Sequence, residues 1–513
     1  MKIVILGAGP AGLYCALLIK KANPMHDITI IERNPADITY GWGVVFSDRT
    51  LASFQRADYK TYEQIRSQFV IWEAINVHFR SETIHCGGHV IASISRKRLL
   101  NILQRRCNEL DITLRFGCEI NDLVDLPEHD LLIAADGVNS LVRKTYTAHF
   151  KPSLQLGKAR YIWLGTQKVL DAFTFIFREN EHGLFQVHAY PFSGTTSTFI
   201  VECDEETWLN AGLDKADEAE SIAYCEQLFV DDLGGATLLS NNSKWIGFPT
   251  LKTQHWHHQD TVLLGDSAHT AHFSIGSGTK LAMEDAIALA NSIDQHSDLE
   301  TALNEYELER KPVVEVFQRA AQESQTYFET IKRYLGLDPM QFTFQLLTRS
   351  GRISYDDLRL RDAHFGDAVD RWFMHKASGS HHIVAPPPMF APLRLRGLTL
   401  PNRVVLLQRD YPQLQGNHKG SPLLDTSAGL IMTAVTAVSA DGRITPDCPG
   451  MYDNDHVATW TQIVETVHTR SSAKIALQLG YAGRRGSTRP RSQGLDRPLR
   501  EGNWPLISAS PIP

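Results

Sequence analysis

The first 150 residues alternate short apolar runs with stretches whose apolar residues recur at helical spacing. Residues 2–6 contain one such apolar run, residues 27–31 form a second predicted strand, and a helical stretch over 13–21 separates them. Uninterrupted apolar strands of this kind are typical of a parallel sheet that is buried on both faces. Between 160 and 203 several longer strands follow one another and indicate an antiparallel sheet. The pattern therefore predicts an α/β fold with an inserted antiparallel sheet.

A glycine-rich turn, Gly7-Ala8-Gly9-Pro10-Ala11-Gly12, follows the first strand, and Glu32 closes the second. This strand–GxGxxG–helix–strand–acid order is the dinucleotide fingerprint of a Rossmann-type domain. Gly7 allows the tight turn, Gly9 lets the backbone approach a pyrophosphate, and Gly12 lets the helix pack against the strand. The helix N-terminus supplies donors for the phosphates, and Glu32 is predicted to accept from ribose hydroxyls.

Two later apolar strands each end in a glycine–acid pair, Asp136-Gly137 and Gly265-Asp266, at loops where open α/β sheets bind ligands. Together with the N-terminal fingerprint they resemble the three flavin motifs of the class A, single-component FAD-dependent aromatic hydroxylases. The resemblance implies that the second motif serves FAD and the approach of NAD(P)H. It also implies that Asp266 holds the ribityl chain and that Arg96 lies close to the flavin.

The fingerprint and the resemblance together predict one FAD per chain, with NAD(P)H as co-substrate and no metal. The residues expected to bind the cofactor are Gly7, Gly9, Ala11, Gly12, Glu32, Arg33, Arg96, Asp136, Gly137, Gly265, Asp266, Gly276, Gly278 and Thr279. A second GxGxxG for a nicotinamide domain is not present in the sequence, which also fits single-component hydroxylases.

Several stretches are similar to one subfamily, the salicylyl-CoA 5-hydroxylases and 2-aminobenzoyl-CoA monooxygenase/reductases. These stretches are 41–47, 161–163, 188–190, 272–276, 346–352 and 358–362. The first four are shared with the violacein-pathway tryptophan hydroxylase, whereas the last two resemble the CoA-ester hydroxylases. The resemblance implies hydroxylation of an electron-rich aromatic ring, of a salicyl- or anthranilyl-type acid carried as a thioester, through a flavin C4a-hydroperoxide.

The protein can assist this chemistry by taking a proton from the hydroxyl or amino group on the ring. Polar candidates for that role are His188, Tyr190, Tyr161 and His272. His188 and Tyr190 are two apart on a predicted strand and therefore share one face. The family usually has Pro-Pro near residues 270–275, and this chain does not. His272 and its neighbour Phe273 are thus expected either to face the substrate or only to pack.

Two other functions fit the same residues. One is a hydroxylase of an indole- or tryptophan-derived substrate in natural-product biosynthesis. The other is a flavin-binding scaffold, without hydroxylase activity, whose tail recruits a partner. A flavin-dependent tryptophan halogenase is disfavoured because its WxWxIP motif does not occur in the sequence.

The composition changes at Ala385-Pro386-Pro387-Pro388, a stiff spacer that predicts a domain boundary. Residues 389–403 resemble the opening of an old yellow enzyme-like flavin barrel, a domain that binds FMN in bifunctional relatives. Residues 386–513 fall short of the roughly 200 residues that a (β/α)₈ barrel needs. We therefore expect a truncated old yellow enzyme-like fragment, a partial (β/α) barrel without redox chemistry of its own, or one that another subunit completes.

The expected organisation has three parts. Residues 1–335 form the FAD-binding monooxygenase domain, in which the substrate-binding sheet occupies about 155–255. Residues 336–385 form a helical linker segment, and 386–513 form the barrel fragment. Because the strands of an incomplete barrel need cover, a homodimer is expected.

Composition limits the partners. A hydrophobic content of 43% and a charged content of 21% are ordinary for a globular enzyme. The net charge of -7 gives no sign of nucleic-acid binding, and the sequence contains no apolar run long enough for a membrane span. Seven widely spaced cysteines without a CxxC argue against a disulfide framework or a zinc site and favour the reducing cytoplasm. The expected partners are therefore an aromatic small molecule and dioxygen.

Overall fold

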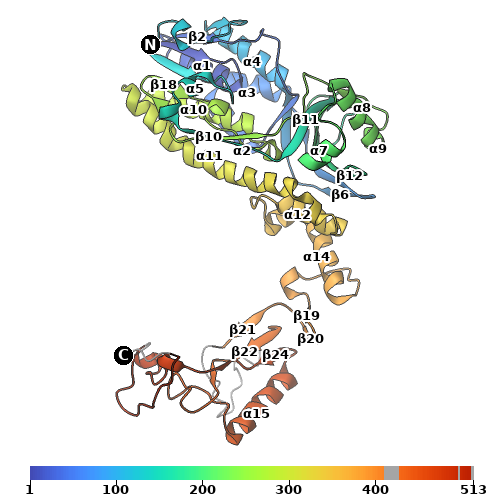
Figure 1. Ribbon diagram of the computed structural model, residues 1–513, viewed down its shortest axis with the longest axis vertical. Coiled ribbons are helices and arrows are strands. Elements are labelled where there is room, and N and C mark those ends of the chain that lie inside the picture. Colours follow the sequence, from blue (N-terminus) through green and yellow to red (C-terminus); the bar gives the residue numbers. More distant parts are fainter. Residues whose placement is uncertain (409–426, 495–496, 510–513) are drawn as a thin grey trace. The chain divides into compact units, whose positions relative to one another are not determined.

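The computed structural model describes residues 1–408, 427–494 and 497–509, and the chain divides into two compact units, 1–365 and 366–513 (Figure 1). The first unit contains two large sheets and the helices that pack on them. In the described residues, no helix is both long enough and apolar enough to cross a membrane.

A six-stranded sheet organises the N-terminal part of the first unit. Its strand order is β17 (His257–His258), β18 (Thr261–Leu263), β9 (Leu131–Ala134), β1 (Lys2–Leu6), β2 (Asp27–Ile31) and β8 (Thr113–Arg115). The five strands from β18 to β8 run parallel, and β17 pairs antiparallel with β18. Because parallel strands end at the same edge, the loops after β1, β9 and β18 lie together. Those three loops carry the three predicted motifs.

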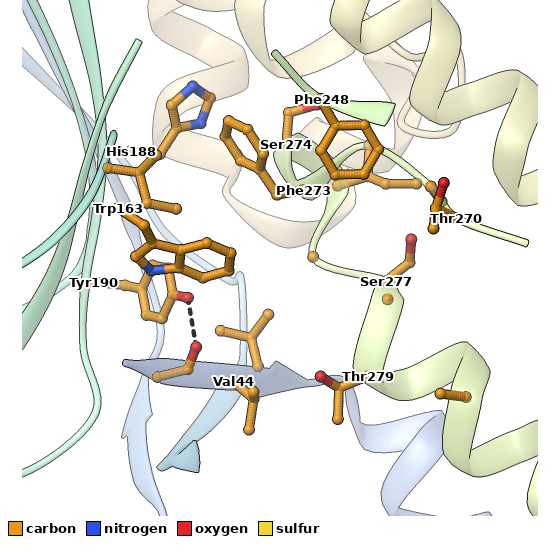
Figure 2. A pocket seen from close by; sticks show the side chains of 18 of the residues that line it. Val44, Trp163, His188, Tyr190, Phe248, Thr270, Phe273, Ser274, Ser277 and Thr279 are labelled. Atoms are coloured by element: carbon orange, nitrogen blue, oxygen red, sulfur yellow. Dashed lines mark hydrogen bonds between the residues drawn. The ribbon is translucent and has the colours of Figure 1, made fainter. Parts of the chain in front are cut away.

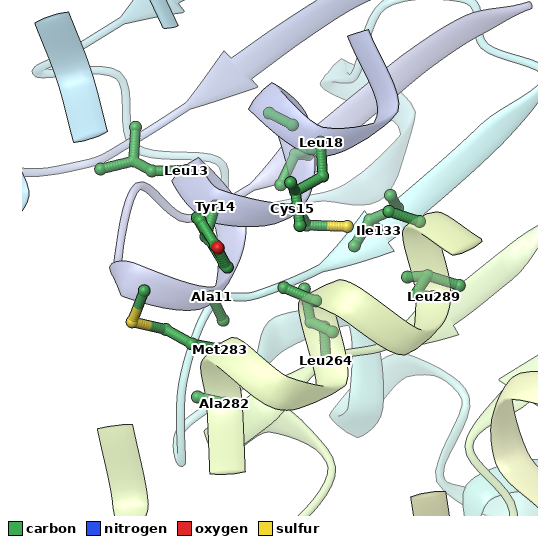
Figure 3. Packing of buried hydrophobic residues seen from close by; sticks show 14 of the residues in the cluster. Ala11, Leu13, Tyr14, Cys15, Leu18, Ile133, Leu264, Ala282, Met283 and Leu289 are labelled. Atoms are coloured by element: carbon green, nitrogen blue, oxygen red, sulfur yellow. The ribbon is translucent and has the colours of Figure 1, made fainter. Parts of the chain in front are cut away.

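Helix α1 (Pro10–Ala22) packs against helix α10 (Gly278–Gln295) to form the main core of this part (Figure 3). Ala11 on α1 and Ala282 on α10 are small side chains that let the two helices approach closely. Leu13, Tyr14 and Met283 are fully buried around them. Complete burial of one such side chain stabilises the fold by about 1.5–3 kcal/mol. This packing fixes the N-termini of both helices beside the motif loops.

A seven-stranded sheet forms the second layer of the first unit. Its order is β15 (Leu238–Leu239), β11 (Ala159–Thr166), β14 (Ser197–Asp204), β13 (Gly183–Pro191), β12 (Phe173–Asn180), β5 (Ile75–Phe79) and β6 (Glu82–Cys86). One face buries alternate residues such as Val187 and Val201 under α7 (Glu205–Asn210), α8 (Glu218–Leu228) and α9 (Val230–Leu233). The residues between them point to the opposite face. That face carries Tyr161, His188 and Tyr190.

The long helix α11 (Leu299–Glu329) runs against α10 and then past the second sheet (Figure 1). Asp298 caps its first turn by accepting a hydrogen bond from the Thr301 backbone N–H at 2.9 Å. Helices α12 (Pro339–Thr348) and α13 (Tyr355–Arg361) follow. Phe342 of α12 stacks on Phe79 of β5 with ring centroids 3.9 Å apart. The segment between α12 and α13 is thereby held beside the sheet.

The second unit contains a parallel three-stranded sheet, β21 (Val405–Leu407), β22 (Leu430–Met432) and β24 (Lys474–Ala476). Helix α15 (Asn454–Arg470) packs against it, and Ile431, Val467 and Ala473 are buried between them. A hairpin of β19 (Leu393–Leu395) and β20 (Leu398–Leu400) precedes this sheet. In the described residues, β22, α15 and β24 form one strand–helix–strand unit with parallel strands, as in an α/β fold.

The glycine turn after β1 is a close backbone contact, which gives a test of the fold. A Cβ added to Gly12 would lie 2.1 Å from the Gly7 carbonyl oxygen. Gly12→Ala should therefore force α1 away from β1, destabilise the unit by about 1–3 kcal/mol and lower its thermal unfolding midpoint. Gly336→Ala is the matched control, because a Cβ there meets nothing within 4 Å. Equal midpoints for the two variants would contradict the close packing of helix and strand.

Candidate active site

A cavity of about 690 Å³ lies between the motif loops of the first sheet and the face of the second sheet that carries Tyr161, His188 and Tyr190 (Figure 2). Its volume falls in the range of small-molecule and cofactor sites. One end is lined by backbone of the motif loops and by the N-termini of α1 and α10. The other end is lined mainly by aromatic side chains of β11, β12 and β13.

The side chain of Glu32 stabilises the glycine turn by accepting a backbone hydrogen bond from it. Its Oε2 accepts a hydrogen bond from the Ala8 backbone N–H at 2.9 Å, and its Oε1 accepts from Asn34. Gly7 has φ of +108°, and a Cβ there would lie 2.3 Å from the Ala135 carbonyl oxygen, so only glycine fits. Gly9 and Ala11 line the cavity, and a Cβ at Gly9 meets nothing within 4 Å. The backbone is thus open to a ligand at Gly9.

Arg143 ties the second motif to the third. Its guanidinium donates to the Ser267 carbonyl oxygen at 2.7 Å and to the Val138 carbonyl oxygen. Asp136 accepts from the Leu141 backbone N–H at 2.7 Å through Oδ2, whereas its buried Oδ1 has no hydrogen-bond partner among the described residues. Burial raises the pKa of the Asp136 carboxyl, against the hydrogen bonds that it accepts. Gly137 lines the cavity directly.

Asp266 and Arg96 place opposite charges on the cavity wall. The Asp266 side chain is accessible from the cavity, and the cavity itself is enclosed by the protein. This burial raises the pKa of the Asp266 carboxyl, and the positive charges of Arg96 and His269 oppose the shift. Burial likewise lowers the pKa of Arg96, against the charge of Asp266. Both side chains are therefore available to a polar ligand between them.

The third motif rests on a buried ionic chain. His269 Nε2 lies 2.7 Å from Asp285 Oδ2, and Arg310 Nε donates to Asp285 Oδ1 at 2.8 Å. Arg310 reaches Glu284 as well, at 3.4 Å. The chain fixes the start of α10, where Gly276, Ser277, Gly278 and Thr279 line the cavity. Gly276 has φ of +61°, which favours glycine at this turn.

These features fit an FAD. Neither α1 nor α10 has an acidic residue in its first turn, so both N-termini can stabilise phosphate. Gly9 and the start of α1 would hold the pyrophosphate, Asp266 the ribityl hydroxyls, and the loop 276–279 the edge of the flavin ring. The structure does not bring Arg33 to the cavity, since its side chain is exposed and is not among the lining residues. Its contact with the cofactor, and the ribose contact of Glu32, stay predictions.

Aromatic side chains of the second sheet form the far end of the cavity, among them Tyr161, Trp163, Phe175 and Tyr190. Figure 2 shows Trp163 and Tyr190 on this side. The Tyr190 hydroxyl donates to the Gly43 carbonyl oxygen at 2.9 Å, and burial raises its pKa to about 12. Tyr161 packs against Phe273 with ring centroids 4.7 Å apart, and burial raises the pKa of its hydroxyl. Both tyrosines therefore stay protonated at neutral pH. They shape the cavity, and a part for either tyrosine in taking the substrate's proton stays a prediction.

His188 is the predicted polar residue best placed to contact a substrate. It lines the cavity beside Phe273 (Figure 2), and its Nε2 lies 3.1 Å from Glu202 Oε2. Its Nδ1 is buried and has no hydrogen-bond partner among the described residues. Burial holds the pKa of His188 well below 6.5, so the imidazole is neutral at neutral pH.

His272 lies behind the cavity wall and is not among the residues that line it. Its Nδ1 is 2.9 Å from Ser274 Oγ, its Nε2 is 3.7 Å from Glu202 Oε1, and burial lowers its pKa to about 4. Residues 272 and 273 were expected either to face the substrate or only to pack. The His272 side chain packs, whereas Phe273 faces the cavity.

Two charged residues of this region were not predicted. Glu202 on β14 is fully buried, and burial raises its pKa to about 7. Arg349 follows α12 and donates to Ser324 Oγ, Leu346 O and Ser274 O at 2.7–2.8 Å. The sequence contains one signal for Glu202, which is the only charged residue in the predicted strand 196–203 and follows the apolar run 199–201. The signal for Arg349 was weaker, because it lay in a stretch noted only for its resemblance.

Comparison with known proteins agrees with this site. Residues 128–321 match the FAD binding domain family, 388–501 the NADH:flavin oxidoreductase / NADH oxidase family, and 2–141 the lycopene cyclase protein family. The chain is 40% identical over 421 residues to salicyloyl-CoA 5-hydroxylase of a Streptomyces species, a match that covers 80% of each chain.

Two further relatives and one solved structure extend the comparison. The chain is 35% identical over 361 residues to 3-hydroxy-4-methyl-anthranilyl-(aryl-carrier protein) 5-monooxygenase of Streptosporangium sibiricum, covering 70% of this chain and 97% of the relative. It is 34% identical over 355 residues to protodeoxyviolaceinate monooxygenase of Chromobacterium violaceum, covering 67% and 92%. The tetrameric form of 2-methyl-3-hydroxypyridine-5-carboxylic acid oxygenase shares the fold, with 18% identity, a TM-score of 0.55 and coverage of 70% and 97%.

The fold, the cofactor cradle and these relatives define a class A flavoprotein. The chain belongs to the family of FAD-dependent aromatic monooxygenases. It is an enzyme that hydroxylates an aromatic ring, with FAD as its cofactor and NAD(P)H as the reductant. The predictions of fold class, cofactor and activity are therefore confirmed, and the scaffold without activity is set aside.

The charge of Asp266 gives a test of the cofactor cradle. Asp266→Asn keeps the shape but removes a charged acceptor for the cofactor hydroxyls, so FAD binding should weaken by about 1.5–3 kcal/mol. FAD released by heat and quantified by chromatography measures the loss. Asp260→Asn is the control, because Asp260 lies on the same segment, is exposed and does not line the cavity. Full FAD occupancy in Asp266→Asn at limiting FAD would contradict the assignment of the third motif.

Proposed function

We propose that the enzyme hydroxylates a salicyl- or anthranilyl-type acid that is carried as a thioester. The observation that carries this proposal is the make-up of the cavity wall, which is aromatic at its far end and cationic along residues 347–361. An aromatic ring fits the first region, and the phosphates of a pantetheine carrier fit the second. The names of the Streptomyces and Streptosporangium relatives both specify an aryl group on such a carrier.

The aromatic region can hold a substituted benzoyl ring. Trp163 and Phe273 have ring centroids 6.3 Å apart, and Phe173 stacks on Tyr190 at 5.6 Å. Aromatic side chains at such separations offer both faces and edges to a ring and exclude water from it. The buried indole nitrogen of Trp163 has no hydrogen-bond partner among the described residues, so it can donate to an oxygen of the substrate.

The cationic region comes from the segment after α12. Arg352 and Arg361 are exposed and line the cavity, and Arg361 Nη1 lies 3.1 Å from His89 Nδ1. Arg349 donates hydrogen bonds to three oxygens of neighbouring residues, and its guanidinium lies 4.8 Å from the Phe328 ring centroid. Arg349 thereby holds the segment in place, while the two exposed arginines can reach phosphate oxygens.

Bound FAD supplies the activated oxygen, and the residues of the chain orient the substrate and exclude water from the cavity. An ortho hydroxyl or amino group makes the ring electron-rich. His188 lies at the aromatic end and can accept the proton of that group at Nδ1. The hydrogen bond from Tyr190 to Gly43 fixes strand β3 (Gly43–Phe46), whose first residues also line the cavity. The substrate ring is therefore held between β3, β13 and the loop of Phe273.

A free indole-type acid is the second candidate substrate, because the chain covers 92% of protodeoxyviolaceinate monooxygenase at 34% identity. Such a substrate has no phosphate for Arg352 and Arg361 to bind. The two candidates therefore differ in their dependence on these arginines.

The arginines give the test of the carrier. In Arg352→Ala combined with Arg361→Ala, the KM for a salicyl- or anthranilyl-CoA thioester should rise about tenfold or more, because two charge-assisted contacts are lost. Substrate-dependent NAD(P)H oxidation measures it, with kcat little changed. Arg359→Ala is the matched control, since Arg359 lies between the two but does not line the cavity. If the wild-type enzyme turns over free acids as well as thioesters, or the double variant keeps its KM, the carrier proposal is wrong.

We also propose that the protein is a cytoplasmic homodimer joined through the second unit. Val405 and Leu407 on β21, the edge strand of the described three-stranded sheet, are 45% and 64% exposed. Apolar side chains on an open sheet edge favour association with another copy. The seven cysteines are all free thiols, which suits a reducing compartment.

A charge on the sheet edge tests the dimer. Leu407→Glu should convert the dimer to a monomer, since it places a carboxylate in the apolar contact. Light scattering at micromolar protein gives the mass. Leu308→Glu is the control, because Leu308 is 67% exposed on α11 in the first unit. A monomeric wild-type protein, or a Leu407→Glu variant that stays dimeric, would argue against this interface.

A further inference from the structure

Glu202 is an acidic residue with no place in the cofactor cradle, yet it is completely buried. It lies on β14, opposite Gln186 of β13 and Tyr161 of β11 in the sheet register. All three side chains point to the cavity face of the sheet, as does His188, two residues along β13 from Gln186. Glu202 itself does not line the cavity. It therefore acts on a substrate only through a neighbour.

The contacts of Glu202 converge on His188. Gln186 Nε2 donates to Glu202 Oε2 at 3.0 Å, and His188 Nε2 lies 3.1 Å from the same oxygen. The imidazole of His188 is enclosed by Phe175, Phe273 and Phe328, with ring centroids at 5.2, 5.4 and 4.6 Å. The ring therefore has little freedom to turn, and the remaining nitrogen, Nδ1, keeps one orientation.

We propose that Glu202 is a positioning residue for hydroxylation, which keeps the proton of His188 on Nε2 and leaves Nδ1 free to accept the proton of the substrate's ring hydroxyl or amino group. A carboxylate that accepts from one ring nitrogen selects this tautomer. Buried polar atoms are normally hydrogen-bonded, and Nδ1 has no partner among the described residues. The hydroxyl or amino group on the substrate ring would supply the missing hydrogen bond to Nδ1. The inference rests on the proposed function for the identity of that substituent.

The proton step balances within these groups. The O–H bond of a ring hydroxyl breaks, its proton moves to His188 Nδ1, and its electron pair stays on the oxygen, where it enriches the ring. The imidazolium so formed is paired with the Glu202 carboxylate through Nε2–H. When the ring takes up its new oxygen, the substituent oxygen becomes a carbonyl. The carbon that received the oxygen then releases its proton to solvent, the C–H electron pair restores the aromatic ring and the negative charge on the substituent oxygen, and Nδ1 returns its proton to that oxygen. The histidine is then neutral again.

The protonation state of Glu202 sets the pH dependence. The groups that face it are His188, His272 and Tyr161, with Arg349 and Glu329 as the nearby charges. Burial dominates and raises the pKa of Glu202 to about 7. Above that pH the carboxylate accepts from Nε2–H. Below it, the protonated carboxyl can donate to Nε2, which moves the histidine proton to Nδ1 and blocks acceptance there. Activity should therefore rise with pH through about 7.

The tautomer of His188 can be measured without a substrate. In FAD-loaded enzyme with ¹⁵N-labelled histidine, assigned by comparison with His188→Asn, the shifts should show Nε2–H at pH 8 and a change through pH 7. Glu202→Gln should abolish that change, remove the limb near pH 7 from kcat/KM and lower kcat on the order of 10²-fold at pH 8, with KM little affected. Glu202→Gln should fold, because it removes the ionisation of a buried group.

The matched control is Glu329→Gln. Glu329 accepts from the Lys158 backbone N–H at 2.7 Å and from Gln325 Nε2 at 2.9 Å, and it acts on Glu202 only through its charge. This variant should keep the tautomer and shift the titration slightly to lower pH. An Nδ1–H tautomer in the wild type at pH 8 would overturn the inference, and this measurement does not depend on the folding of any variant. An unchanged tautomer and pH profile in Glu202→Gln would do so as well. Failure of thioester turnover with the expected tautomer would contradict the proposed substrate alone.

Discussion

The close contact between the glycine turn after β1 and the loop after β9 is the constraint on which the site depends. At Gly7 the two backbones leave no room for a Cβ, which would lie 2.3 Å from the Ala135 carbonyl oxygen. Arg143 then joins the loop after β9 to the loop after β18 by hydrogen bonds to two carbonyl oxygens. Three segments that are far apart in sequence therefore present one continuous cradle. The packing of α1 on α10 holds that cradle rigid.

The substrate end of the cavity is built on a different principle. Its wall is one face of a mixed, mainly antiparallel sheet, so its shape follows from the alternation of side chains along β11, β13 and β14. Gln186 and His188 both contact Oε2 of the buried Glu202, whereas Oε1 has no hydrogen-bond partner among the described residues, and burial raises the pKa of the carboxyl. Such a site is stabilised by packing on its outer face under α7, α8 and α9. Function and stability thus occupy opposite faces of the same strands.

The sequence predicted the parts of the site that depend on local patterns. The glycines of 7–12 and the pair at 265–266 belong to short motifs that a few neighbouring residues define. The shared face of His188 and Tyr190 follows from their spacing of two along a strand. Glu202 was not predicted because its meeting with His188 depends on the register between β13 and β14, which residue spacing does not reveal. The placement of His272 behind the wall depends on the fold of the loop before α10. The family match over residues 388–501 confirms the predicted flavin-barrel fragment, whereas the domain boundary near residue 385 stays a prediction.

In the proposed reaction, an atom of dioxygen enters the ring of an aryl thioester that is bound in this cavity. Turnover of a salicyl-CoA thioester under ¹⁸O₂ with NAD(P)H, followed by mass spectrometry of the product, measures this transfer. We expect one ¹⁸O atom on the ring of the hydroxylated thioester, with about one NAD(P)H consumed for each product molecule. Consumption of NAD(P)H that yields only hydrogen peroxide, with the labelled product absent for salicyl- and anthranilyl-CoA alike, would contradict it.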